Sequence, residues 1–203
     1  MDGSRSLWAN ILMYVISPLC VLVCSVSCSQ QPYSGAITIT PSPTFKENTA
    51  LLPTVQLDVV GVTAIELQRW KVYPVSDYWM VGNTFRKSAA RQSFVMTTKQ
   101  PGPFKLSQWS SERPTWKKTG VTSLVLMADL PGAWREKPPK AKGPPPPGVN
   151  WYEPGDDPRR LVIPWTQGAY GFFTSHVNIS MLPNGMKLMT PVDMSKAVPA
   201  AGK

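Results

Sequence analysis

Proline limits the fold of this chain more than any other residue type. The 203 residues include 22 prolines, about twice the ordinary share of roughly 5%. Proline interrupts helices and the interior of sheets, because its nitrogen carries no hydrogen and its ring fixes φ. Long helices are therefore not expected, and short strands joined by extended connections are. The length allows one well-packed domain of ordinary size.

Short strand-like runs follow one another from residue 54 onward. In residues 54–60, Val55, Leu57 and Val59 occupy alternate positions, so their side chains share one face of a strand. Residues 121–130 form the most apolar run of this part of the chain and end at a Pro-Gly pair, which predicts a buried central strand. Further strands are predicted at 93–98, 103–107, 159–165, 175–181 and 186–189.

Four other segments are less regular. Residues 75–81 are strand-like, whereas 61–73 fits either a loop with a helical turn or a strand. Residues 37–39 predict a short edge strand. Residues 137–148 contain six prolines, three lysines and two glycines, which predicts a stiff basic polyproline II segment.

The closing part of the chain is typical of a β-hairpin. Val177, Ile179 and Met181 alternate, and the Asn-Gly pair at 184–185 favours a tight turn before a short final strand. About eight short strands in all predict an all-β, two-sheet sandwich. We expect residues 1–27 to be a signal peptide or anchor, 28–53 a flexible tether, 54–190 the domain with a proline-rich insertion at 137–158, and 191–203 a tail.

All three cysteines lie at the end of one apolar run, and the remaining 175 residues contain none. The run at 7–28 follows a short segment with Arg5 and ends in small residues, which is the layout of a secretory signal. Its last four residues, Ser-Val-Ser-Cys28, resemble a bacterial lipobox, in which a small residue precedes the acylated cysteine. Cys24 is the alternative, but Val23 precedes it.

An uncleaved transmembrane anchor is the other interpretation, because about 20 apolar residues can span a bilayer. Either interpretation attaches the domain to a membrane. In the lipoproteins that the lipobox resembles, Asp after the acylated cysteine retains the protein in the inner membrane. Ser29 stands at that position here, which favours a lipid anchor in the outer membrane, on its periplasmic face.

The formal charge of +9 lies in the exported part of the chain and favours anionic partners. No zinc-finger spacing, helix-turn-helix pattern or aromatic-basic RNA motif accompanies it, so nucleic acid is not expected as a partner. A solvated basic surface is the simpler interpretation of the charge.

The residue inventory offers little for catalysis. The single histidine, His176, falls on the outward face of its predicted strand, so a Ser-His-Asp or Cys-His triad is not expected. Asp156 and Asp157 lie in a Gly/Pro turn before two arginines, where neutralisation or solvation is expected. No nucleotide-binding glycine pattern or metal-ligand spacing is present. We therefore predict no enzyme activity, no cofactor and no metal site.

Eight tryptophans are the remaining unusual feature. Four of them, Trp70, Trp109, Trp116 and Trp151, lie in segments predicted to be loops. Exposed aromatic residues are enriched at protein interfaces, although core packing is an equally good explanation for each one.

From residue 121 on, the order of features resembles that of the outer-membrane lipoprotein of bacterial type VI secretion, the TssJ family. The apolar strand 121–127 is followed by a stretch from Asp129 to Trp134-Arg135, by an apolar strand at 161–165 and by the closing hairpin 177–188. The proline-rich insertion and residues 83–118 depart from that order.

The resemblance implies a transthyretin-like sandwich of two four-stranded sheets, present in several copies in a ring-like complex. It also implies binding to the periplasmic domain of a large inner-membrane secretion protein, through the loop between the first two strands. Carried to this chain, that loop is 61–73, and the expected contact residues are Glu66, Gln68, Arg69 and Trp70. The alternatives are a periplasmic glycan-binding or transport lipoprotein and an anchored accessory subunit of another envelope complex.

Overall fold

The computed structural model describes residues 31–44, 54–97, 99–153, 155–171 and 174–193. Cys28, the apolar run before it and most of the predicted C-terminal tail lie outside these ranges. Within them, no helix is long and apolar enough to cross a membrane.

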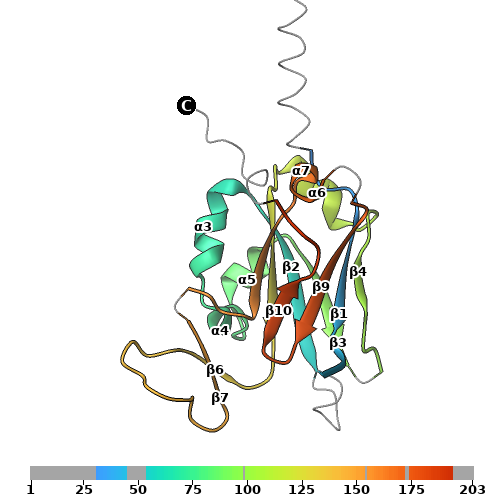
Figure 1. The fold of residues 1–203 in the computed structure, drawn as a ribbon. Coiled ribbons are helices and arrows are strands. Elements are labelled where there is room, and N and C mark those ends of the chain that lie inside the picture. Colours follow the sequence, from blue (N-terminus) through green and yellow to red (C-terminus); the bar gives the residue numbers. More distant parts are fainter. Residues whose placement is uncertain (1–30, 45–53, 98, 154, 172–173, 194–203) are drawn as a thin grey trace, which may run out of the picture.

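Two four-stranded sheets face each other and form a sandwich, which confirms the predicted fold class (Figure 1). The first sheet has the order β10-β9-β1-β4, and the second has the order β3-β2-β5-β8. The strands of the first sheet are β1 (Ala36–Pro41), β4 (Phe104–Leu106), β9 (His176–Leu182) and β10 (Gly185–Leu188). Those of the second are β2 (Val55–Val62), β3 (Arg91–Met96), β5 (Ser123–Asp129) and β8 (Arg160–Pro164).

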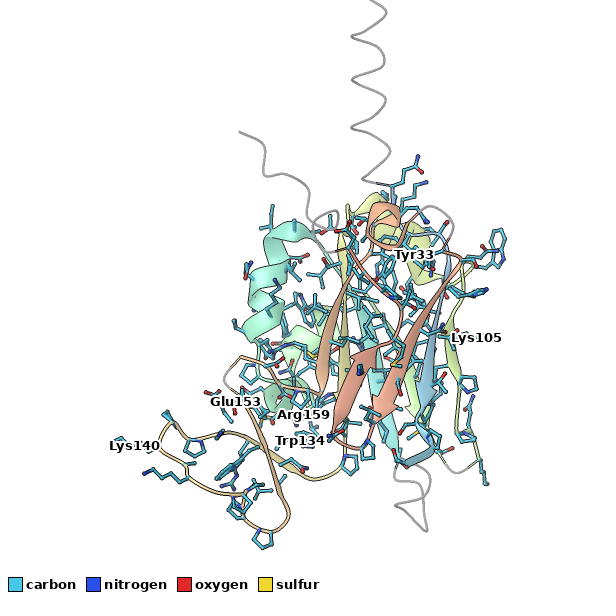
Figure 2. All side chains as sticks on the ribbon, viewed as in Figure 1. Tyr33, Lys105, Trp134, Lys140, Glu153 and Arg159 are labelled. Atoms are coloured by element: carbon cyan, nitrogen blue, oxygen red, sulfur yellow. The ribbon has the colours of Figure 1, made fainter. Side chains whose placement is uncertain are left out.

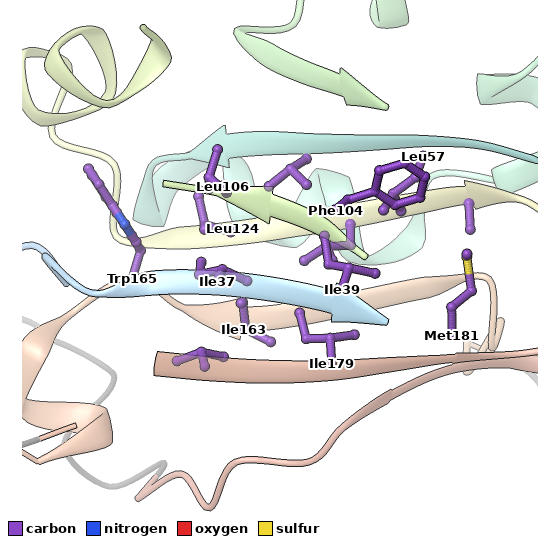
Figure 3. Packing of buried hydrophobic residues seen from close by; sticks show 14 of the residues in the cluster. Ile37, Ile39, Leu57, Phe104, Leu106, Leu124, Ile163, Trp165, Ile179 and Met181 are labelled. Atoms are coloured by element: carbon purple, nitrogen blue, oxygen red, sulfur yellow. The ribbon is translucent and has the colours of Figure 1, made fainter. Parts of the chain in front are cut away.

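The core between the sheets is built from alternate residues of the strands, as period-2 patterning requires. Figure 3 shows side chains of both sheets meeting there. Burying each large aliphatic side chain contributes about 1.5–3 kcal/mol. The residues at this interface that are 1% exposed or less include Ile37, Ile39, Leu57, Val59, Leu106, Leu124, Leu126, Ile163, Val177, Ile179 and Met181.

The prediction of an edge strand at residues 37–39 is wrong. Strand β1 lies inside its sheet, parallel to β9 on one side and antiparallel to β4 on the other. It looked peripheral in the sequence because it is short and stands among Ser, Thr and Pro residues. The expected tether at 28–53 thus contains an inner strand of the sandwich.

The prediction of a strand at 75–81 is also wrong. Residues 75–78 form the short helix α4 (Val75–Tyr78), and a turn follows it. Pro74 precedes the first helical residue, and Val75 and Tyr78, three positions apart, are both buried. A pattern of apolar residues over only seven positions fits helical and strand periods alike.

Residues 61–73, which the sequence left open, contain the end of β2 and the helix α3 (Ala64–Val72). Thr63 begins the helix with a capping box. The Glu66 amide donates to the Thr63 hydroxyl at 3.4 Å, and the Thr63 amide donates to the Glu66 carboxylate at 3.1 Å. With α4 and α5 (Thr84–Ser88), this helix forms an insertion between β2 and β3.

The insertion covers the outer face of the second sheet (Figure 1). Strands β2 and β5 are therefore buried on both faces, which explains the nearly continuous apolar run of β5. The apolar residues of this second cluster are Val60, Val62, Trp70, Val75, Tyr78, Val125 and Met127.

The proline-rich insertion contains one short pairing. Strand β6 (Ala133–Glu136) lies parallel to β7 (Val149–Tyr152), so the predicted insertion at 137–158 includes a strand that the prolines around it concealed. Residues 137–148 between them form neither helix nor strand, as expected.

The two ends of the sandwich differ in what they carry (Figure 1). One end holds α6 (Glu112–Lys118) and α7 (Gln167–Tyr170), and the described chain enters there, where Pro32 bridges to Thr166. The opposite end holds α4 and the β6-β7 pair. We call these the entry end and the far end.

Candidate docking surface

A buried carboxylate fastens the helical insertion to the second sheet. Asp58 of β2 is 0% exposed and points away from the sandwich core. Its Oδ2 accepts from the Tyr78 hydroxyl at 2.9 Å and from Nε of Arg86 at 2.8 Å, and its Oδ1 accepts from the Ser93 hydroxyl at 2.6 Å. Arg91 forms a second ion pair at 3.4 Å. The carboxylate thus joins β2, β3, α4 and α5.

The burial of Tyr78 raises the pKa of its hydroxyl well above the ordinary value of 10, and the charge and hydrogen bond of Asp58 raise it further. The phenol therefore stays protonated at neutral pH and acts as a donor to Asp58. This arrangement satisfies a buried charge from several elements at once, so its first role is to hold the insertion in place.

Aromatic side chains fill the space beneath α3. Trp70 lies 4.3 Å from Phe85 and 5.9 Å from Tyr78 between ring centroids, and Tyr73 stacks on Phe85 at 4.3 Å. Arg69 is itself exposed, and its guanidinium lies over the Phe85 ring, 4.4 Å from the centroid. One face of α3 is thereby committed to packing.

The opposite face of α3 is exposed and carries apolar side chains. Ile65 and Val72 are 93% and 73% exposed, and they lie seven positions apart, on one side of the helix. Gln68 and Arg69 fall between them at the third and fourth positions, and both are exposed. We call these four residues the outer stripe of α3. The turn after α4 adds Met80 and Val81, which are 64% and 106% exposed.

The four contact residues expected from the sequence do not act alike. Gln68 and Arg69 belong to the outer stripe, and Glu66 is exposed but engaged in the capping box. Trp70 is only 5% exposed, so the prediction that it is an exposed side chain is wrong. The two interpretations of 61–73 were a loop with a helical turn and a strand. A full helix was not predicted, and its spacing is what separates Trp70 from Gln68 and Arg69.

The position of the contact loop also changes. To locate the contact loop, the resemblance to the family was applied with residues 54–60 as the first strand. In the structure, β1 precedes that strand. The connection between the first two strands is therefore 42–54, of which 45–53 lie outside the described residues. The α3 region lies between the second and third strands, so its candidacy rests on its own exposed apolar residues.

A second candidate is a hollow of about 410 Å³ at the far end. It lies between the β6-β7 pair, the turn before β8 and the β9-β10 turn, and Figure 2 shows Trp134, Glu153 and Arg159 in this region. Burial raises the pKa of the Tyr152 hydroxyl, which keeps it protonated. The lining consists of Trp134, Pro145, Asn150, Trp151, Tyr152, Glu153, Asp156, Pro158 and Asn184.

The two acidic residues at 156–157 have different environments, since Asp157 is buried and Asp156 is exposed. Asp157 is 3% exposed and accepts from Nε and Nη2 of Arg159 at 3.0 and 2.7 Å, which confirms the expected neutralisation. Arg159 in turn lies 5.3 Å from the Trp134 ring centroid and donates to the Ser76 hydroxyl at 3.1 Å. Asp156 is exposed beside the hollow.

The residues considered for catalysis or metal binding include His176. His176 lies on the outward face of β9 and is exposed, as its alternation predicted. Among the described residues, no group of three His, Cys, Asp or Glu side chains is placed to hold a metal ion.

Trp109 and Trp116 differ in exposure: one is exposed and the other is buried. Trp116 of α6 is 0% exposed and donates from Nε1 to the Ala90 carbonyl at 3.1 Å. Trp109, in the connection before α6, is 84% exposed. Trp151 is partly buried and lines the hollow.

No protein-family model matches the chain, and no curated protein matches it significantly. The solved structures that resemble it include two from type VI secretion systems. Lip of Serratia marcescens, a membrane-bound component of the type VI secretion system, is 10% identical with a TM-score of 0.42, over 79% of this chain and 99% of Lip. The type VI secretion lipoprotein TssJ1 of Pseudomonas aeruginosa is 10% identical with a TM-score of 0.35, over 80% of this chain and 97% of TssJ1.

Proposed function

We propose that this protein is a lipoprotein of a type VI secretion membrane complex, acylated at Cys28 and anchored in the outer membrane. It binds the periplasmic domain of the large inner-membrane protein of that complex through the outer stripe of α3. Its role is mechanical. The anchor holds the domain at one membrane, and the docked partner connects it to the other.

The order of elements supports the family assignment. The apolar strand, the Asp-to-Trp-Arg stretch, the next apolar strand and the hairpin that the resemblance rests on are β5, the start of β6, β8 and the β9-β10 pair. They belong to a sandwich of two four-stranded sheets, which is the fold that the resemblance implies.

The exposed face of α3 is the observation that carries the docking proposal. Large apolar side chains at positions i and i+7 with polar neighbours between them are typical of a helix face that binds a protein surface. The basic residues Arg69, Lys71 and Lys87 outnumber the acidic residues Glu66 and Asp77 on the exposed insertion. We therefore expect a partner surface with an apolar groove and an acidic rim.

The test is co-purification of the large inner-membrane secretion protein with the full-length, affinity-tagged chain from cross-linked envelopes. The double variant Ile65→Glu, Val72→Glu is expected to reduce its recovery about tenfold or more, because losing an interface anchor costs more than about 1 kcal/mol. Both positions are exposed, so the fold is retained, and a circular dichroism melt checks this.

Met189→Glu is the matched control, since Met189 is 57% exposed and does not belong to the stripe. It should leave recovery unchanged. Replacement of residues 45–53 by a Gly-Ser segment of equal length tests the other connection. If that replacement abolishes recovery while the α3 variant does not, the docking surface is not the stripe.

Acylation is tested separately by Cys28→Ser. The variant is expected to incorporate no labelled fatty acid and to leave the outer-membrane fraction, while Cys24→Ser behaves like the unaltered chain. Membrane retention of an unprocessed Cys28→Ser chain would instead support the transmembrane anchor.

The hollow at the far end supports a second candidate, binding of a glycan. Aromatic faces suit the apolar faces of sugar rings, and amide and carboxylate side chains can bond their hydroxyls. Titration with soluble peptidoglycan fragments should quench tryptophan fluorescence, and Trp151→Ala should reduce the quenching. Equal fluorescence with and without the fragments would count against this candidate.

A further inference from the structure

The entry end of the domain lies close to the point where the chain leaves its membrane anchor. The Gln167 amide donates to the Gln31 carbonyl at 2.7 Å, and the Tyr33 amide donates to the Trp165 carbonyl at 3.2 Å. The two terminal nitrogens of the Arg113 guanidinium hold the next residues: Nη1 donates to the Tyr33 carbonyl at 3.0 Å and Nη2 donates to the Gly35 carbonyl at 2.7 Å. The chain is therefore fixed to α6 and α7 from residue 31 on.

Gln31 stands three positions after Cys28. A fully extended chain covers at most about 3.6 Å per residue, so Gln31, where the chain meets the entry end, is within about 11 Å of Cys28. This limit applies to an acylated Cys28 and to a retained apolar segment ending there, because both end at the same residue. It places the entry end against the headgroup layer, which is itself several ångströms thick.

The entry end has the side chains that suit such a position. Trp109 is 84% exposed in the connection that leads into α6. Arg113 and Trp116 occupy the buried face of that helix, and Lys117 and Lys118 are exposed at its end. Residues 107–120 carry three basic residues and one acidic residue, a net charge of +2.

We propose that the entry end is a membrane-contact surface, with Trp109 in the headgroup layer and Lys117 and Lys118 against anionic phospholipid headgroups. Tryptophan favours the interface between water and the acyl chains, and a basic residue near an anionic surface is attracted to it. The contact fixes the orientation of the domain, so that the far end with α4 and the β6-β7 pair points away from the bilayer (Figure 1). This inference rests on the anchor in the proposed function but not on the α3 docking surface.

The test uses the full chain reconstituted in phosphatidylglycerol vesicles that contain lipids brominated near the headgroup end of the acyl chain. Flotation first measures whether the chain is anchored. Tryptophan fluorescence then reports contact, since bromine quenches an indole only at close range. We expect quenching in the unaltered chain and its loss in Trp109→Phe, whose remaining tryptophans provide the background.

The pair Lys117→Glu, Lys118→Glu is expected to lose the Trp109 quenching in phosphatidylglycerol vesicles. Its matched control is Lys140→Glu, Lys142→Glu, the same change of charge in the exposed proline-rich segment (Figure 2 labels Lys140), which should keep the quenching.

Flotation with equal quenching in the unaltered chain and in Trp109→Phe would overturn the membrane contact alone and would favour a protein partner at this end. Absence of flotation would overturn the anchor and this inference together. The co-purification experiment with the α3 variant tests the docking surface only, and neither of its outcomes affects the membrane contact.

Discussion

The two faces of the sheet β3-β2-β5-β8 are held by different kinds of interaction. Its inner face meets the other sheet through the larger apolar cluster, with residues such as Leu57, Leu124 and Leu126. Its outer face meets the helical insertion through a smaller apolar cluster and through the donors around Asp58. Apolar packing is non-directional, whereas hydrogen bonds and ion pairs require one arrangement. The comparison suggests that the inner face provides stability and the outer face provides the placement of α3.

Among changes on the outer face, the largest effect is expected from Asp58→Ala. The change leaves Arg86 and Arg91 without their shared carboxylate, and breaking a buried ion pair costs about 3–5 kcal/mol. Arg86 is 24% exposed, so water recovers part of this, and we expect a loss of about 3 kcal/mol in the free energy of unfolding. Urea denaturation measures it.

Hydrogen exchange then separates the two faces. In Asp58→Ala, the amides of α3, α4 and α5 should exchange faster while those of β1 and β9 stay protected, because the insertion opens as its own unit. Asp58→Asn is the control, since it keeps an acceptor for Tyr78. Uniform loss of protection across both sheets would mean that the insertion is not separable.

Leu126 and Met127 offer a matched pair on the two faces of β5. Both are 0% exposed, and Leu126 packs in the sandwich core whereas Met127 packs under the insertion. Truncation to Ala costs about 2–5 kcal/mol where the surroundings cannot collapse. We expect about 3 kcal/mol for Leu126→Ala and about 2 kcal/mol for Met127→Ala, because short helices adjust more easily than paired strands. If Met127→Ala lost more free energy of unfolding than Leu126→Ala, the outer face would contribute more to stability than the inner face.

The strands that form the inner face could be predicted from the sequence, whereas the helices on the outer face could not. The inner face follows a strict period of two, so β2, β3, β4, β5, β8 and the closing hairpin were predicted close to their observed bounds. The outer face was not predicted, because its helices are four to nine residues long and their partners are distant in the chain. Asp58 stands at a polar position of an alternating strand, where exposure is the usual outcome, and only its distant donors show that it is buried.

The candidate site was predicted in part for the same reason. Gln68 and Arg69 were identified from side-chain type, but Ile65 and Val72 were not, since an apolar residue is usually assigned to a core. The position of β1 depends on its pairing with β9, about 140 residues later in the chain, and no local pattern reveals such a pairing.

Gly61 tests how closely the inner face is packed. A Cβ at this position would lie 2.5 Å from Cδ1 of the Trp116 indole, closer than such atoms approach in proteins. Trp116 is fully buried and meets Trp165 edge to face, with 5.7 Å between centroids, so it has little room to move. Gly61→Ala should reduce the free energy of unfolding by about 2 kcal/mol through overpacking. Thermal melts of the variant measure this loss, and a melting temperature unchanged from that of the unaltered chain would mean that the Trp116 indole moves aside.

The smallest effect is expected from Tyr78→Phe, which removes one hydrogen bond to Asp58 and keeps the ring. The loss at pH 8 should be about 1 kcal/mol, the usual net value of a hydrogen bond. Above pH 10 the unfolded chain releases the phenolic proton, whereas the folded chain retains it because burial and Asp58 raise the pKa of Tyr78. The unfolded state then binds fewer protons, so the stability that Tyr78 provides falls as the pH rises. Urea titrations between pH 8 and pH 11 should therefore show the difference between the two proteins shrinking. A constant difference would mean that the Tyr78 hydroxyl is not held by Asp58, and that the outer face is fastened by its arginines alone.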